Sequence, residues 1–157
     1  MIIFDFIQIL ILRSCICMKK KIGGDCILFT IGGVVYGLIE IVWRKYTHWS
    51  MVITGGVCFI VLYRMFKKIT ECSMAVKCLV GSTVITAIEL IAGYIFNICM
   101  KLRVWDYSKM PMNFCGQICL LYSVLWGFLT VPIVMVCKAI NKKFNLWFDS
   151  PFDVQTG

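Results

Sequence analysis

The sequence predicts an all-α membrane protein, a polytopic bundle of four transmembrane helices preceded by a short N-terminal apolar segment. Two observations predict this class. Of the 157 residues, 61% are hydrophobic and 15% are charged, and the mean hydropathy is +0.88. A soluble domain is about 45–50% apolar and about 25% charged. The apolar residues also gather in runs of about 20, the length with which a helix crosses the hydrocarbon core.

Four runs have the length and composition of a membrane span, at about 22–43, 49–66, 76–100 and 114–137. Each is expected to be helical, because lipid offers the backbone no other hydrogen-bond partner. Together they delimit a transmembrane domain at 22–137, followed by a cytoplasmic tail at 138–157. In the second run, which is the shortest, Trp49 and Tyr63 suit anchoring at the two interfaces.

The N-terminal segment, 1–21, is apolar at its start and basic at its end. Its first 12 residues, MIIFDFIQILIL, are too short for a span and contain Asp5. No small-residue cleavage site follows, as a signal peptide would require. We expect the segment to lie in the membrane interface or to precede a true start at Met18, where MKKK leads into the first span. A span at 1–17 is the remaining alternative.

Basic residues orient the predicted spans. Eleven Lys and Arg residues lie in the N-terminal segment, the middle loop with its flank and the tail, against five in the other two loops. Because cytoplasmic loops carry the basic excess, we expect a cell-membrane protein with both termini in the cytoplasm. A span at 1–17 would put the N-terminus outside. We therefore expect the basic residues behind the net charge of +8 to interact with lipid headgroups rather than with nucleic acid.

The chain also contains a candidate internal repeat of one helix pair. GVVYGLIEI (33–41) aligns with STVITAIEL (82–90), which places Glu40 on Glu89, and GGVCFIVLY (55–63) aligns with GQICLLYSV (116–124). The second copy has 12 extra residues in its loop under this alignment. Parallel repeats of this kind occur in transporters, with sites at the repeat interface. Chance similarity between apolar segments is the alternative.

Small and polar residues form a stripe along one face of three predicted spans. In the third span the set is Ser82, Thr86, Glu89, Gly93 and Asn97, whose spacing places them on one helix face. The sets in the other two are Gly33, Gly37, Glu40 and Arg44 in the first span, and Asn113, Gly116, Ser123, Gly127 and Thr130 in the fourth. Polar groups that face lipid are costly, so we expect the stripes to point at one another.

Glu89 is the sharpest single candidate. It lies near the middle of its span, where a charged side chain costs at least ~2.5–3.5 kcal/mol, so an intramembrane carboxyl group is a functional candidate by default. The alternative is a structural glutamate that binds Ser, Thr or Trp donors. Glu40 lies near the outer end of the first span and is expected to pair with Arg44 at i+4.

Two aromatic-polar clusters, RKYTHWSM (44–51) and VWDYSKMPMNF (104–114), are expected at the outer face. Together with the stripes they predict a polar, outward-facing pocket above a buried glutamate. Its candidate substrate-binding residues are Glu89, Glu40, Arg44, His48, Trp105, Asp106, Tyr107, Asn113, Gln117 and Asn97. The alternative is an aromatic belt, because Trp and Tyr favour the interface in any membrane protein.

Catalytic and cofactor motifs are absent from the sequence. The single histidine, His48, has no HxxxH or HExxH partner, and the ten cysteines are scattered through apolar runs without a CxxC pair. No metal or other cofactor is therefore expected, and an enzyme that uses His48 with a carboxylate on a lipid or amphipathic substrate is the secondary interpretation. No Walker A loop is present, so an ATP-driven role would need a separate ATPase subunit.

Three stretches carry a family resemblance: GGVVYGLIEIVWRKYTHWSMVITGG (32–56), IELIAGYIFN (88–97) and VWDYSKMPMNFCGQICLLYSVLW (104–126). They resemble the ABC-transporter type IV (CmpB-like) membrane family over roughly residues 30–130. The resemblance implies a small polytopic protein that acts as a transporter or permease component, and it carries over no catalytic or binding residues. The stretch before Met18 departs from the family pattern.

Transport is accordingly the leading functional prediction, with the lipid bilayer as partner and an ATPase or other membrane subunits as candidate partners. A lipid-directed enzyme and a structural membrane partner remain as alternatives. A homo-oligomer is compatible with the sequence.

Overall fold

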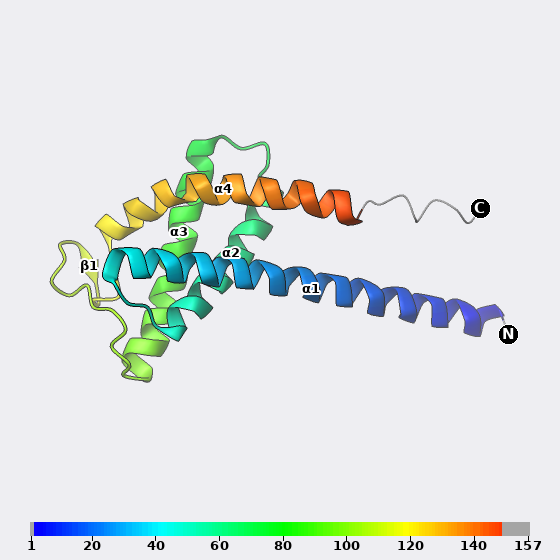
Figure 1. The fold of residues 1–157 in the computed structure, drawn as a ribbon, viewed down its shortest axis with the longest axis horizontal. Helices are drawn as coiled ribbons and strands as arrows, with labels where there is room; N and C mark the ends of the chain where they lie inside the picture. The colour runs from blue at the N-terminus through cyan, green and yellow to red at the C-terminus, as the bar shows by residue number, and fades with distance from the viewer. Residues whose placement is uncertain (1, 149–157) are drawn as a thin grey trace. The chain divides into compact units, whose positions relative to one another are not determined.

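The computed structural model describes residues 2–148, with the side chains of residues 23–143. Its helices are α1 (Ile2–Arg44), α2 (Trp49–Lys68), α3 (Met74–Gly93) and α4 (Leu120–Phe148), and α3 continues into a π-helical segment, η1 (Tyr94–Cys99). A short antiparallel hairpin, β1 (Asn113–Phe114) and β2 (Ile118–Cys119), precedes α4 (Figure 1). The expected interfacial position of residues 1–21 stays a prediction, because the side chains of these residues lie outside the described part.

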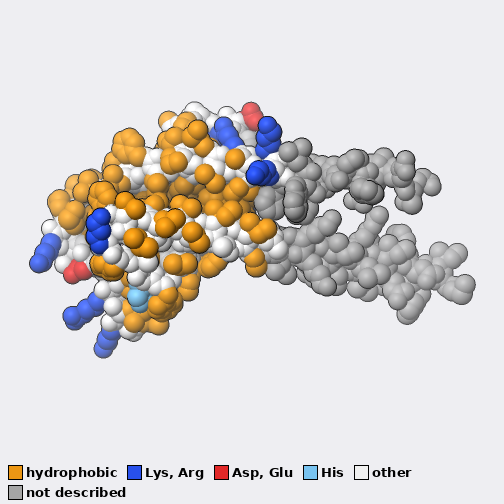
Figure 2. Space-filling view, in the orientation of Figure 1, with side chains coloured by type: hydrophobic (Ala, Val, Ile, Leu, Met, Phe, Trp, Pro, Cys, Tyr) orange, Lys and Arg blue, Asp and Glu red, His pale blue; other side chains and the backbone are white. Residues whose placement is uncertain are grey.

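Among residues 23–143, four helical stretches are long and apolar enough to cross a membrane: Gly23–Arg44, Trp49–Lys68, Met74–Cys99 and Leu120–Lys143. This finding confirms the predicted all-α, four-span class. The helices expose many large apolar side chains, among them Val42, Leu79 and Phe128. Figure 2 shows such apolar groups over most of the visible face, with Lys and Arg near the ends of the helices. A surface of this kind suits a lipid environment.

The fourth span begins later than the sequence predicted. Residues 113–119, placed at the start of that span, instead form the hairpin, and α4 begins at Leu120. The backbone explains the difference, because Cys115 and Gly116 have φ angles of 53° and 67°, which a right-handed helix cannot contain. The predicted stripe of the fourth span therefore loses Asn113 and Gly116 to the hairpin.

The chain forms two compact units, residues 1–60 and residues 61–157, with the boundary inside α2. The first unit holds α1 and the beginning of α2. The second holds the end of α2, then α3, η1, the hairpin and α4. Residues 138–148, predicted as the start of the tail, continue α4, and 149–157 lie outside the described residues.

In the first unit, α1 and α2 approach closely at glycines. A Cβ added to Gly33 would lie 2.8 Å from the carbonyl oxygen of Val52, and one added to Gly56 would lie 2.6 Å from the Phe29 ring. Both distances are shorter than real Cβ contacts. At Gly33 the obstacle is backbone, so a side chain there would push the helices apart, whereas at Gly56 the Phe29 ring would have to move. Small residues serve the same purpose in other membrane helix pairs, where van der Waals packing drives association.

The internal contacts of the two helix pairs correspond. Adding 49 to a residue number in α1 gives its counterpart in α3, and adding 71 to one in α2 gives its counterpart in α4. Under these shifts the close approach of Gly33 to the Val52 carbonyl corresponds to the hydrogen bond from Ser82 to the Ser123 carbonyl. The ends of α1 and α3, and the starts of α2 and α4, match under the same shifts. With these shifts the loop at 45–48 corresponds to the longer connection at 94–119. The second helix of each pair is therefore aligned differently from the sequence alignment proposed above. The duplication itself stays a prediction.

Candidate functional site

A polar seam joins α3 to α4 in the second unit. Ser82 donates to the carbonyl oxygen of Ser123 at 2.5 Å, and Thr86 donates to the Ser123 hydroxyl at 3.0 Å. Two glycines continue the seam: a Cβ on Gly81 would overlap the Thr130 side chain, whereas one on Gly127 would make an ordinary contact with Ser82 at 3.8 Å. The stripes predicted on the third and fourth spans thus face each other along these residues.

Glu89 lies in the same seam and is buried. Only 3% of its surface is exposed, and its Oε2 accepts a hydrogen bond of 2.7 Å from the indole nitrogen of Trp126, which is itself buried. A buried carboxyl group needs donors of this kind, because an unmatched one would carry a desolvation cost of several kcal/mol. The sequence placed Glu89 correctly on the inner face of α3. It did not identify Trp126 as the partner.

An aromatic series leads from the loop toward this carboxyl group. The ring of Tyr107 stacks on Tyr122 with centroids 4.7 Å apart, and Tyr122 lies 6.4 Å from Trp126. Tyr107 belongs to the connection between η1 and the hairpin, whereas the other two belong to α4. The contact between Tyr107 and Tyr122 therefore joins the predicted outer cluster to the helix that binds Glu89.

Asn97, in the π-helical segment, holds the long connection in place. Its Nδ2 donates to the Trp105 carbonyl at 2.9 Å and to Oε1 of Gln117 at 2.8 Å, while its Oδ1 accepts from the backbone of Val104 at 2.7 Å. Trp105 in turn donates from its indole to the Gln117 carbonyl at 2.9 Å. Three predicted site residues, Asn97, Trp105 and Gln117, are thus brought together. The cluster is anchored in a π-helical segment, a feature that recurs at functional sites.

Asp106 and Asn113 shape the hairpin loop. The Asp106 carboxylate accepts from the Ser108 backbone at 2.8 Å, and this bond lowers the pKa of Asp106, which is fully exposed. Asn113 donates to the carbonyl oxygens of Ser108 and Met110 and accepts from the Gly116 backbone. These bonds close a turn, so the side chains of Asp106 and Asn113 both stabilise the local loop structure.

In the first unit, the predicted candidates form a separate group. Glu40 and Arg44 make the expected i,i+4 ion pair at 3.0 Å, and the Arg44 guanidinium also binds the hydroxyl of Tyr46 and lies over its ring. The pair joins side chains of one helix. Its Glu40 is buried, at 8% exposure.

His48 lies immediately before α2 and caps it. Its Nδ1 accepts from the backbone nitrogen of Ser50 at 3.3 Å and contacts the Ser50 hydroxyl at 2.8 Å. The first backbone N–H groups of a helix have no partner within it, and a side-chain acceptor at the cap position satisfies one of them. The lone histidine, which invited an interpretation as a base, therefore has a local structural role through Nδ1.

The ten predicted site residues therefore form two described groups. The first unit contains Glu40, Arg44 and His48, and the second contains Glu89, Asn97, Trp105, Asp106, Tyr107, Asn113 and Gln117. A single outward-facing pocket would draw on both groups and stays a prediction. Among the described side chains, no cluster of three His, Cys, Asp or Glu residues is placed to hold a metal ion.

Comparison with known proteins gives one match. No curated protein and no solved structure matches the chain. The family described as "Putative ABC-transporter type IV" matches residues 27–153, which include all four spans apart from the first residues of the first. The match covers most of the chain and agrees with the resemblance carried by its sequence motifs. The chain belongs to this family of membrane proteins.

Proposed function

We propose that the chain is the membrane-embedded component of an ATP-driven transporter and works with a separate ATPase subunit. Family membership and the four apolar spans support this assignment. The printed sequence has no Walker A loop, so a partner must supply ATP hydrolysis. The proposal places the protein's own contribution in the membrane rather than in nucleotide chemistry.

Within this function we assign the substrate-contacting role to the Glu89 group: Glu89 and Trp126, with Tyr107 and Tyr122 leading toward them. The observation that carries this assignment is the burial of the Glu89 carboxyl group in the middle of a span, hydrogen-bonded to Trp126. An ionisable group at this depth marks a substrate or ion pathway in many membrane proteins. The aromatic faces beside it would suit a cationic substrate group, through cation–π attraction and the carboxylate charge.

One observation favours a structural role instead. Among the described side chains, every buried nitrogen and oxygen atom has a hydrogen-bond partner. A seam that is already satisfied can hold α3 and α4 together without any ligand. The structural alternative therefore predicts that loss of the Glu89 carboxylate affects stability alone.

The test separates the two roles by measuring coupling and stability on the same variants. The full chain is purified from its native membranes in mild detergent as wild type, Glu89→Gln and Glu71→Gln. The last is the matched control, because Glu71 is an exposed carboxylate in the loop at 69–73. Co-purification of an ATPase, its rate of ATP hydrolysis and retention of small molecules by native mass spectrometry are measured beside the melting temperature.

For a transporter component, an ATPase co-purifies with the wild type. Glu89→Gln then lowers ligand retention or substrate-stimulated ATP hydrolysis by about tenfold, the effect of losing one charge-assisted contact, while Glu71→Gln has no such effect. A wild-type chain that purifies without ATPase activity and without a retained ligand contradicts the proposal. A fall in melting temperature as the sole effect of Glu89→Gln supports the structural role.

A further inference from the structure

A cavity in the second unit, away from the Glu89 group, gathers basic side chains at one end of three spans. It has a volume of about 50 Å³ and is lined by Tyr63, Phe66, Lys67, Thr70, Lys77, Val134, Cys137, Lys138 and Asn141. A cavity of about 10–15 Å³ on this measure holds one water molecule, so this one has room for a small polar group. Three of the lining residues are lysines and none is Asp or Glu.

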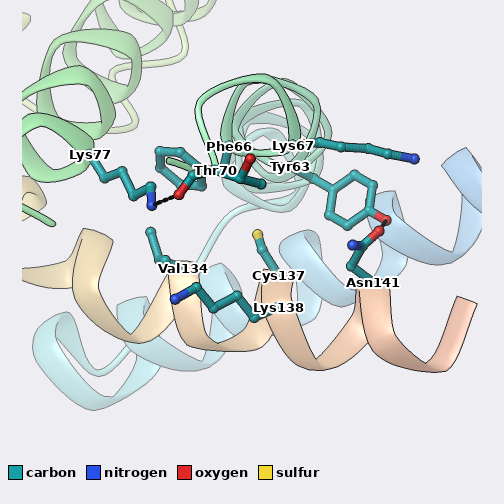
Figure 3. A pocket seen from close by; sticks show the side chains of 9 residues that line it. All are labelled: Tyr63, Phe66, Lys67, Thr70, Lys77, Val134, Cys137, Lys138 and Asn141. Carbon is teal, nitrogen blue, oxygen red and sulfur yellow. Dashed lines mark hydrogen bonds between the residues drawn. The ribbon is translucent and has the colours of Figure 1, made fainter. Parts of the chain in front are cut away.

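Lys77 is the buried cation of this cavity. It is 5% exposed, and its ammonium group donates to the carbonyl oxygen of Thr70 at 2.6 Å. An ammonium group carries three donors and no acceptor, so one bond to Thr70 uses a third of its capacity. Figure 3 shows the amine of Lys138 on the same side of the cavity as that of Lys77, beside Val134, whereas Lys67 extends away.

A neutral donor stands on the opposite side. The hydroxyl of Tyr63 donates to Oδ1 of Asn141 at 3.3 Å, which leaves the two N–H donors of the amide for another acceptor. In Figure 3 the amide nitrogen of Asn141 lies on the side of Cys137. The cavity thus presents two cationic amines and an amide as donors, with apolar contacts from Phe66, Val134 and Cys137.

The donor set identifies the class of ligand. Donors without acidic neighbours select an anion, and lysines act on phosphate as point charges, whereas planar carboxylates favour the fork of an arginine. No arginine lines the cavity. A tetrahedral phosphate group, which accepts from several directions at once, fits this arrangement.

The position in the fold indicates the source of the phosphate. The α2 helix ends at Lys68 and the α3 helix begins at Met74, so the cavity lies within the terminal turns of these two helices, beside residues 134–141 of α4. Lipid headgroups meet a transmembrane protein at this depth. The distribution of basic residues predicts that this end is cytoplasmic. Anionic lipids are concentrated on that side, and basic pockets between spans bind their headgroups there.

We propose that this cavity binds the phosphate group of an anionic phospholipid, held by Lys77, Lys138 and Asn141. The apolar lining residues would contact the lipid where its chains leave the headgroup. Such a site is independent of the transport proposal, because it uses none of the residues of the Glu89 group.

Native mass spectrometry of the full chain in detergent tests the site, with added phosphatidylglycerol as the ligand. The variants are Lys138→Gln, which changes an exposed side chain, and Asn141→Asp, which keeps the acceptor of Tyr63 but replaces the amide donor with a negative charge. The matched control is Lys142→Gln, which removes an exposed charge from the same helix outside the cavity. Phosphatidylcholine serves as the zwitterionic lipid control.

We expect one tightly retained phosphatidylglycerol per chain, and a loss of retention of about fivefold or more in Lys138→Gln and Asn141→Asp, as for one charge-assisted contact. Lys142→Gln should stay within about twofold, since a surface charge contributes little. Equal retention in all four proteins, or an equal loss in the control, overturns the site.

A separate arm distinguishes a soluble phosphate from a lipid. Melting temperatures are measured with inorganic phosphate and with matched chloride in the absence of lipid. Stabilisation of the wild type by phosphate, lost in Asn141→Asp, together with no lipid retention, supports the phosphate site but assigns it a soluble ligand. If the wild type shows neither lipid retention nor stabilisation by phosphate, the proposal is refuted.

Discussion

The hydrogen bond between Trp126 and Glu89 makes a quantitative prediction about the α3–α4 seam. Trp126→Phe keeps an aromatic ring but removes the donor from a carboxyl group that is 3% exposed. Loss of a buried hydrogen bond of this kind costs about 1–3 kcal/mol. The smaller ring adds about 1 kcal/mol, for roughly 40 Å³ of lost volume at ~24 cal/mol per Å³. The free energy of unfolding should therefore fall by about 2–4 kcal/mol.

The assay is equilibrium unfolding in mixed micelles followed by circular dichroism, with a double-mutant cycle. Glu89→Gln keeps a carbonyl acceptor for the indole, so alone it should cost less than Trp126→Phe. A cycle that pairs Trp126→Phe with Glu89→Leu, which removes the acceptor, should fail to add by about 1–3 kcal/mol, because both changes then remove the same contact. Trp43→Phe is the matched control at a side chain that is 65% exposed, and it should stay within about 0.5 kcal/mol.

Two results would refute this reasoning. The first is a Trp126→Phe variant as stable as the Trp43→Phe control. The second is simple additivity in the cycle, which would show that the two side chains do not interact energetically despite their 2.7 Å separation.

Three further predictions follow from single contacts. Gly81→Ala should destabilise the chain by about 1–3 kcal/mol in the same unfolding assay, because the new Cβ would overlap Thr130. Gly23→Ala, whose Cβ would have no atom within 4 Å, should instead stabilise α1 by up to ~1 kcal/mol. Equal effects of the two substitutions would contradict the packing argument. Asn97→Asp keeps the acceptor for Val104 but loses both amide donors, so hydrogen exchange in residues 100–119 should accelerate, and unchanged protection would count against the anchoring role. The Asp106 carboxyl should titrate below its ordinary pKa of 3.8 in a carbon NMR titration, since the Ser108 bond favours the charged form. The contribution of this bond to stability is then present above pH 3.8 and is lost as the pH falls through the lower folded-state pKa. Asp106→Asn should abolish this pH dependence of stability. A titration midpoint of Asp106 at or above 3.8 would contradict the prediction.

Much of the α3–α4 seam could be predicted from the sequence, because the membrane makes polar positions informative. Ser82, Thr86 and Glu89 share one helix face, and lipid offers them no partner, so they had to meet another protein surface. Ser123 and Thr130 on the fourth span supplied that surface, as their spacing indicated. The ion pair of Glu40 with Arg44 followed equally from the i,i+4 rule.

Other features lacked a sequence signal of this strength. The hairpin at 113–119 contains the polar residues Asn113 and Gln117 among apolar ones. The prediction placed Asn113 and Gly116 in a polar stripe and so began the fourth helix too early. The positive φ angles of Cys115 and Gly116, which exclude a helix there, have no signal in hydropathy. Tryptophan was among the donors expected for a structural Glu89, but nothing in the sequence distinguished Trp126 from the other tryptophans as that donor. The partner of Lys77 is a backbone carbonyl, and no residue type could have revealed it.

The contact of Trp126 with Glu89 also gives the protein a built-in optical reporter. Indole emission responds to the charge of a group bound at its nitrogen, so protonation of Glu89 or the arrival of a cation beside it should change the colour or intensity of Trp126 fluorescence. Trp105 provides a reference, because its indole binds a backbone carbonyl that cannot titrate. Events in the membrane interior can thus be followed in the unlabelled chain once the other tryptophans are replaced by phenylalanine.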